Sequence, residues 1–106
     1  MENEVILVKV RITDELAQQI VDSAKAVVGW NINFIDCQGR VMASTDSSRI
    51  GAYHKAGHVA ARTGQVQTVQ ADRPDEGVSK GVNYPIVMGR QVLGVIGITG
   101  EPAVVG

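Results

Sequence analysis

The chain has 106 residues, of which 44% are hydrophobic and 20% charged, with a formal net charge of -1 and a pI near 6.1. This length suits one domain with its own core, and the scattered basic residues argue against a nucleic-acid-binding surface. No apolar run approaches a membrane span, no signal-peptide pattern opens the chain, and a lone cysteine suits a reducing compartment, so we expect a cytoplasmic protein.

The first twelve residues, MENEVILVKVRI, are either an extra strand or an N-terminal extension of the domain. Val8, Val10 and Ile12 alternate with basic residues, as in a half-buried strand. We therefore divide the chain into residues 1–12 and a domain over residues 13–106.

The next segment carries the pattern of an amphipathic helix. Thr13 suits its N-cap, and Gly29 suits its C-terminal end. Its apolar stripe is wider than one neighbouring layer needs, because Ala17 and Val21 extend it. The stripe consists of Leu16, Ala17, Ile20, Val21, Ala24, Val27 and Val28. We therefore predict a homodimer built on this helix, held by hydrophobic contact.

Residues 30–44 predict a β-hairpin. The run WNINFI (30–35) has the alternation of a strand, Asp36 and Gly39 suit the two ends of a tight turn, and residues 41–44 return as the partner strand. Asn33 then faces either solvent or a ligand, and the pattern leaves both readings open. Cys37, in the turn, has no base beside it in sequence, so we interpret it as an incidental thiol rather than a nucleophile.

Residues 44–64, STDSSRIGAYHKAGHVAARTG, have the chemistry of an anion site. Hydroxyls, a guanidinium and free amides precede a helix predicted over residues 52–62, whose first turn lacks carboxylates. The residues concerned are Ser47, Ser48, Arg49 and Gly51, with His54 one turn into the helix. The simpler alternative is that Ser47 or Ser48 caps the helix and Arg49 is solvated.

Two histidines, His54 and His58, share one face of that helix at a spacing that can chelate a metal. No third ligand stands at a recognisable spacing, so we predict no metal site. His54 is preferred as a hydrogen-bond donor to a ligand, and His58 as a surface residue.

The C-terminal part predicts an edge strand over residues 65–70, a polar loop over 71–80, and a long hairpin that reverses at Gly89 and Arg90. Pro85 marks a bulge or backbone that faces a pocket. Glycines 94, 97 and 100 indicate close approach of a helix or a ligand to the sheet. The order of elements predicts an α+β fold, with a single antiparallel sheet and helices packed on one face.

Three segments together resemble the sensor domain of the carbohydrate (sugar) diacid regulators: LAQQIVDSAKAVVGWNINFIDCQGRVMAST, DSSRIGAYHKAGHVAARTG and GVNYPIVMGRQVLGVIGITGEP. The resemblance implies a PAS- or Cache-like fold that binds small hydroxylated acids such as glucarate, galactarate or glycerate. In that family a helix-turn-helix region further along the chain binds DNA. We therefore expect an excised sensor, with DNA contacted only through a region absent from this sequence.

The resemblance also implies two poles for the carboxylates and hydroxyl-reading groups between them. Arg49, Gly51 and the first helical amides match one pole, residues 80–83 supply candidates for the rest, and Ser44 and Asn33 read hydroxyls. Arg49 is expected to act at all pH values and His54 more strongly in acid. The predicted ligand-binding residues are Asn33, Ser44, Ser48, Arg49, Ile50, Gly51, His54, Lys80, Gly81, Val82, Asn83 and Pro85.

Two other function classes stay open at this point. One is a dimerisation module with a vestigial pocket, which the broad stripe of the first helix would serve equally well. The other is a small enzyme, for which His54 with Cys37 or Asp46 is the only conceivable catalytic pair. No cofactor fingerprint accompanies either class, and we expect a sensor without turnover.

Overall fold

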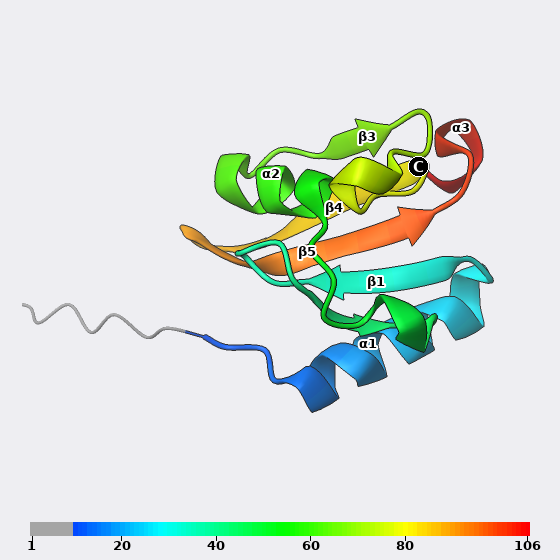
Figure 1. Ribbon diagram of the computed structural model, residues 1–106. Coiled ribbons are helices and arrows are strands. Elements are labelled where there is room, and N and C mark those ends of the chain that lie inside the picture. Colours follow the sequence, from blue (N-terminus) through cyan, green and yellow to red (C-terminus); the bar gives the residue numbers. More distant parts are fainter. Residues whose placement is uncertain (1–9) are drawn as a thin grey trace, which may run out of the picture.

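The computed structural model describes residues 10–106 (Figure 1). Helix α1 (Asp14–Val28) has the predicted boundaries: Thr13 Oγ1 accepts a hydrogen bond from the Leu16 amide, and Gly29 closes the helix with φ +77°. Residues 10–12 form neither helix nor strand, and the rest of the predicted N-terminal strand lies outside the described residues.

Five strands form one antiparallel sheet in the order β2-β1-β5-β4-β3. Both predicted hairpins are present, and the short strand β3 is at an edge as predicted. The predicted fold class, α+β with a single antiparallel sheet covered by helices, is therefore confirmed. The strands are β1 (Asn31–Ile35), β2 (Val41–Ser44), β3 (Gln67–Val69), β4 (Gly81–Met88) and β5 (Gln91–Thr99).

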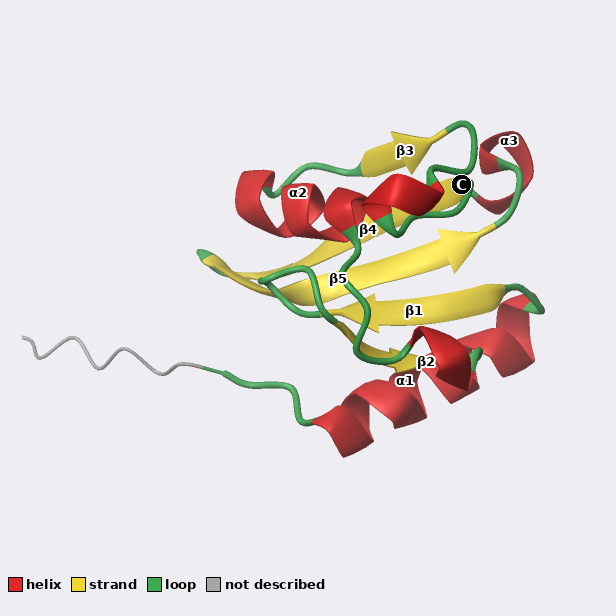
Figure 2. Ribbon diagram, viewed as in Figure 1, coloured by secondary structure: helices red, strands yellow, loops and turns green. Residues whose placement is uncertain are grey.

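The two longer helices lie on opposite faces of this sheet rather than on one face (Figure 2). Helix α1 packs against Ile32 and Phe34, whereas α2 (Lys55–Thr63) packs against Ile35. Successive residues of a strand point to opposite faces, so neighbours such as Phe34 and Ile35 must be covered by different layers. The alternation of β1 was visible in sequence, but the face that each helix covers was not.

Ala17 and Val21 are fully buried in the contact between α1 and the sheet. Their predicted role in a second-subunit contact is therefore wrong, because they are the residues that attach α1 to its own sheet. The side of α1 turned to solvent carries other apolar residues, with Leu16 43%, Val28 44% and Val27 84% exposed.

The segment between β2 and α2 covers the outer edge of the sheet. The Val41 amide donates to Ala52 O at 2.9 Å, and the Gly51 amide donates to Val41 O at 2.8 Å. The 3-10 helix η1 (Ser47–Arg49) precedes this contact. Helix α2 begins later than predicted because residues 51–53 are held along β2.

Residues 71–80, predicted as a loop, contain a second 3-10 helix, η2 (Pro74–Glu76), closed by a bridge between Arg73 and Val78. Pairing of β3 with β4 ends at Asn83, so Pro85 has a strand neighbour only in β5. A register shift follows one residue later, between Ile86 and Val87. The short helix α3 (Pro102–Val105) completes the described chain.

Candidate functional site

A row of polar side chains crosses the sheet on the face that α2 covers. Register pairs Ser44 with Asn33, Asn33 with Gly97, Gly97 with Asn83, and Asn83 with Gln67, so the row touches all five strands. Ser44, Asn33 and Asn83 are at most 4% exposed. Burying an amide or hydroxyl group destabilises the fold unless the group is hydrogen-bonded. A buried polar row is therefore unusual in a core and calls for an account of its hydrogen bonds.

The hydrogen bonds within the row do not use every donor and acceptor of its side chains. Ser44 Oγ donates to Asn33 Oδ1 at 2.6 Å, and Asn83 Nδ2 donates to Gln67 O at 3.3 Å. Within residues 10–106, Asn33 Nδ2 and Asn83 Oδ1 have no hydrogen-bond partner. One donor and one acceptor therefore remain for a hydroxylated ligand.

Gly97 lies at the centre of the row, between Asn33 and Asn83. A Cβ atom there would lie 2.7 Å from Asn83 Oδ1 and 3.5 Å from Ile35 Cδ1. The close approach predicted for this glycine is thus made by a polar side chain of the sheet itself. Any larger residue would displace Asn83 and close the middle of the row.

Arg49, at the end of η1, extends across to the segment that follows η2. Its Nη1 donates to Ser79 Oγ at 3.1 Å and its Nη2 donates to Gly77 O at 3.0 Å. Both acceptors are neutral, so the guanidinium keeps its charge uncompensated by a direct carboxylate contact. It borders a cleft of about 340 Å³ lined by Ser48, Arg49, Ala52, Asp72, Pro74, Gly77, Val78 and Ser79.

Gly77 joins this cleft to the start of α2. Its φ is +70°, and a Cβ atom there would lie 2.0 Å from Tyr53 O and 3.9 Å from His54 Cα. Only glycine tolerates both the conformation and the approach. The residue whose carbonyl accepts from Arg49 is therefore packed directly against the backbone that leads into α2.

His54 is the N-cap of α2 and is only 3% exposed. Its Nδ1 accepts a hydrogen bond from the Gly57 amide at 2.9 Å, which places the proton of the neutral ring on Nε2. Burial, and then the Arg49 charge, lower the pKa of His54 to about 4. The ring of His54 is therefore neutral in mild acid in this structure, which argues against the expectation that it binds a ligand more strongly there.

The loop amides predicted to form an anion pole already have acceptors. The Ser48 amide donates to Asp46 Oδ1, the Ile50 amide to Ser47 O and the Gly51 amide to Val41 O. The Ser48 hydroxyl also donates to Asp46 Oδ1, at 2.7 Å, and these hydrogen bonds lower the pKa of the Asp46 carboxyl. Of the predicted pole, the Arg49 guanidinium and the first amides of α2 remain.

The residues predicted from the start of β4 divide between the two faces. Gly81, Asn83 and Pro85 share the face that α2 covers, whereas Val82 points to the other. Lys80 precedes the strand, and its Nζ pairs with Glu101 Oε2 at 3.1 Å. The structure thus places Asn33, Ser44 and Asn83 in one row under α2, whereas Arg49 borders the cleft beside η2.

The metal site and the catalytic pair considered in the sequence analysis are not assembled among the described residues. His58 Nδ1 contacts Tyr53 Oη at 2.7 Å, while His54 Nδ1 binds its own helix. The Cys37 thiol donates to Val92 O at 3.2 Å, and burial and then the Asp36 charge raise its pKa. No group of three His, Cys, Asp or Glu side chains that could hold a metal occurs in residues 10–106.

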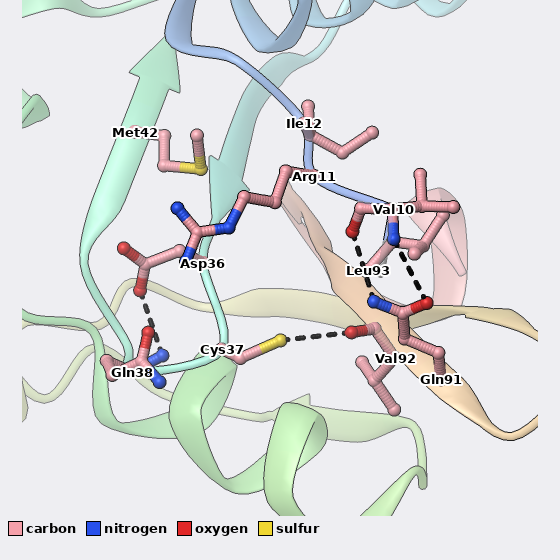
Figure 3. Close-up of a pocket in the computed structure, with 10 residues that line it drawn as sticks. All are labelled: Val10, Arg11, Ile12, Asp36, Cys37, Gln38, Met42, Gln91, Val92 and Leu93. Atoms are coloured by element: carbon pink, nitrogen blue, oxygen red, sulfur yellow. Dashed lines mark hydrogen bonds between the residues drawn. The ribbon is translucent and has the colours of Figure 1, made fainter. Parts of the chain in front are cut away.

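A second cavity, of about 310 Å³, lies on a different part of the molecule (Figure 3). It is lined by residues 10–12, the β1–β2 turn and the start of β5, and the Gln91 side chain pairs with both backbone groups of Val10. None of the predicted ligand-binding residues lines it. The Asn33, Ser44 and Asn83 row lies instead on the face that α2 covers, so we place the candidate site on that face.

Comparison with known proteins identifies the family to which this chain belongs. Residues 12–106 match the family model described as "Putative sugar diacid recognition". The chain belongs to this sugar diacid recognition family. It is 36% identical over 90 residues to the Carbohydrate diacid regulator of Escherichia coli (strain K12), covering 83% of this chain and 23% of that protein.

Two further relatives are named without a function. The Uncharacterized protein YsfB of Bacillus subtilis (strain 168) is 30% identical over 90 residues, covering 83% of this chain and 24% of that protein. An uncharacterized protein of Haemophilus influenzae is 30% identical over 89 residues, covering 81% and 24%. This sequence therefore spans about a quarter of the length of these relatives. No helix in residues 10–106 is both long and apolar enough to cross a bilayer.

Sequence reasoning missed three residues of the candidate site: Gly77, Ser79 and Gln67. Gly77 and Ser79 bind Arg49, and Gln67 O accepts from Asn83. The polar segment 71–80 gave no periodicity from which the first two contacts could be read. Gln67 contributes its backbone carbonyl, and side-chain identity does not reveal which carbonyl is used.

Proposed function

We propose that this chain is the ligand-binding sensor domain of a transcriptional regulator and recognises a small hydroxylated acid, of the glucarate, galactarate or glycerate type, without turnover. The observation that carries this proposal is the Arg49 guanidinium, which borders a cleft and donates to neutral partners, while a buried row of amides and hydroxyls crosses the sheet face under α2. The guanidinium suits a carboxylate, and the row suits hydroxyls. Membership of the sugar diacid recognition family supports the same ligand class.

The bound acid would act on the fold through the two segments that Arg49 connects. Arg49 at present holds the η2 side of the cleft through Gly77 and Ser79. A carboxylate that binds Arg49 in place of Gly77 or Ser79 would weaken the contact between η1 and the segment after η2. We propose that the resulting shift of these segments is passed to β5 through the polar row. A regulator needs such a difference between free and bound states, because a ligand shifts an equilibrium only by its differential affinity.

Calorimetric titration with hydroxy acids tests this function directly. Arg49→Ala is expected to weaken binding of a cognate acid by about 1.5–3 kcal/mol, the range for a hydrogen bond to a charged group, at every pH from 5 to 8. Arg62→Ala is the matched control, since Arg62 is an exposed residue in the last turn of α2. Saturable binding with unchanged ligand supports a sensor, whereas recovery of a chemically altered acid would contradict it.

A second candidate function is dimerisation, and exposed apolar side chains on α1 favour it. Leu16, Val27 and Val28 face solvent although Ala17 and Val21 are buried against the sheet. We propose that these exposed residues meet a second copy, and that any DNA contact is made elsewhere in a longer regulator. A cytoplasmic location is part of the same proposal, because regulators of transcription act there.

A further inference from the structure

The face of the sheet on which α1 packs is only partly covered by helices. Helix α1 lies over β1 and β2, and α3 packs on β4, where Gly106 lies beside Val82 (Figure 2). The middle of β4 and β5 therefore has no helix over it on this face within residues 10–106. We call this strip the β4–β5 shelf, and its side chains are Tyr84, Ile86, Met88, Ile96 and Ile98.

Strand register places all five shelf side chains on the α1 face. Phe34, in the core beneath α1, is paired with Ile96, and Ile96 is paired with Tyr84. Alternation along each strand brings the other three side chains to the same face. Met88 is 55% exposed, the other four are partly buried, and none of the five is charged. The shelf is thus an apolar strip that solvent reaches.

The flank of α1 beside the shelf is also apolar. Gln18, on the opposite flank, hydrogen-bonds the backbone of Ser44 in the edge strand β2, so the first flank is turned toward β5. It carries Leu16 and Val27, which are 43% and 84% exposed, with Ile20 between them. The shelf and this flank form an apolar corner, with the sheet as its floor and α1 as its wall.

This corner has the dimensions of one helix. Strand β4 has eight residues and is about 26 Å long, and a helix of 15 residues, the length of α1, is about 22 Å long. Packed helices lie about 8–10 Å apart, which is the width of two strands. A second helix beside α1 would therefore lie over β5 and β4.

We propose that a second copy of this chain occupies the corner, with its own α1 beside the first. The inference rests on the dimerisation proposed above and adds the sheet face to it. Each copy has both an apolar flank and a shelf, so the contact is symmetric and closes as a dimer. With a net charge of -1 per chain, the two copies repel each other little.

The remaining sides of α1 fit this arrangement. Leu16 and Val27 of the two copies meet along the wall. Ser23 and Ala26, which are exposed on the side of α1 turned away from its own sheet, lie over the shelf of the other copy. Their small side chains let the helix approach the shelf closely, and water is excluded from the apolar strip.

Two adjacent residues of β4 supply a matched pair of variants. Met88 and Val87 are 55% and 54% exposed and point to opposite faces of the sheet. Sedimentation equilibrium of the 106-residue chain over a range of concentrations measures the dimer dissociation constant, and circular dichroism checks that each variant is folded. Met88→Glu is expected to raise that constant by about 10-fold or more, because it buries an unpaired charge. Val87→Glu should leave it within about twofold of the parent.

The outcomes separate this inference from the proposals on which it rests. A dimer that Val27→Glu dissociates and Met88→Glu does not would overturn the inference and leave dimerisation intact. Equal weakening by Met88→Glu and Val87→Glu would also overturn it, because the effect would not be specific to one face. A parent that is monomeric throughout would overturn the inference and the dimerisation together, whereas the binding of acids is tested separately by calorimetry.

Discussion

The protonation of His54 should make the stability of the fold depend on pH in a calculable way. The pKa of His54 is lowered from an ordinary 6.5 to about 4. The unfolded chain therefore binds more protons than the folded one between these values, and stability rises with pH through this window. The contribution is complete above pH 6.5 and is lost as the pH falls toward 4. A shift of this size corresponds to about 3 kcal/mol, of which roughly 2–3 kcal/mol should disappear between pH 7 and pH 4.5.

The physical cause lies in the cap of α2. Nδ1 of His54 accepts from the Gly57 amide, and a protonated Nδ1 cannot accept. Protonation would also place a second positive charge, in a buried position, beside Arg49. The folded state resists the proton for both reasons.

Urea unfolding of the parent and of His54→Asn at pH 7 and pH 4.5 measures this contribution. Asparagine can accept the same amide hydrogen bond but does not titrate, so exposed carboxylates affect both proteins equally. The parent should lose roughly 2–3 kcal/mol more than the variant on acidification. An equal loss of unfolding free energy in the two proteins would show that His54 is not the group responsible. It would refute the conclusion that His54 is buried and caps α2.

Five further substitutions test the packing and the proposed dimer. Gly97→Val should cost about 1–3 kcal/mol through overpacking, because its side chain must displace Asn83; a variant that melts at the parent temperature and binds ligand equally would contradict this. Gly77→Ala should be strongly destabilising in thermal melts, whereas Gly64→Ala, also at positive φ but in open space, should cost less. Val21→Glu should unfold the domain by circular dichroism, while Val27→Glu should keep the fold and shift sedimentation toward monomer; a parent that is already monomeric would rule out the dimer.

The polar row shows where sequence reasoning reached its limit at the candidate site. Asn33 and Ser44 were both singled out, but the choice between a solvent face and a ligand face could not be made. Register and burial exclude the solvent face, because Asn33 is paired with Gly97 and lies buried on the face that α2 covers. Val82 and Asn83 looked equally suitable in sequence, and strand alternation sends them to opposite faces.

The sequence by itself determined the local elements. Caps at Thr13 and Gly29, the turn closed by Gly39 and the reversal at Gly89 fix helix ends and hairpins through interactions within a few residues, and the structure has each of them. Only the tertiary structure decided which face of the sheet each helix covers, that Val21 is core, and that Arg49 reaches Gly77 and Ser79. These contacts join residues far apart in the chain, and they depend on register and on competition among several apolar stripes for one sheet, which no short stretch of sequence contains.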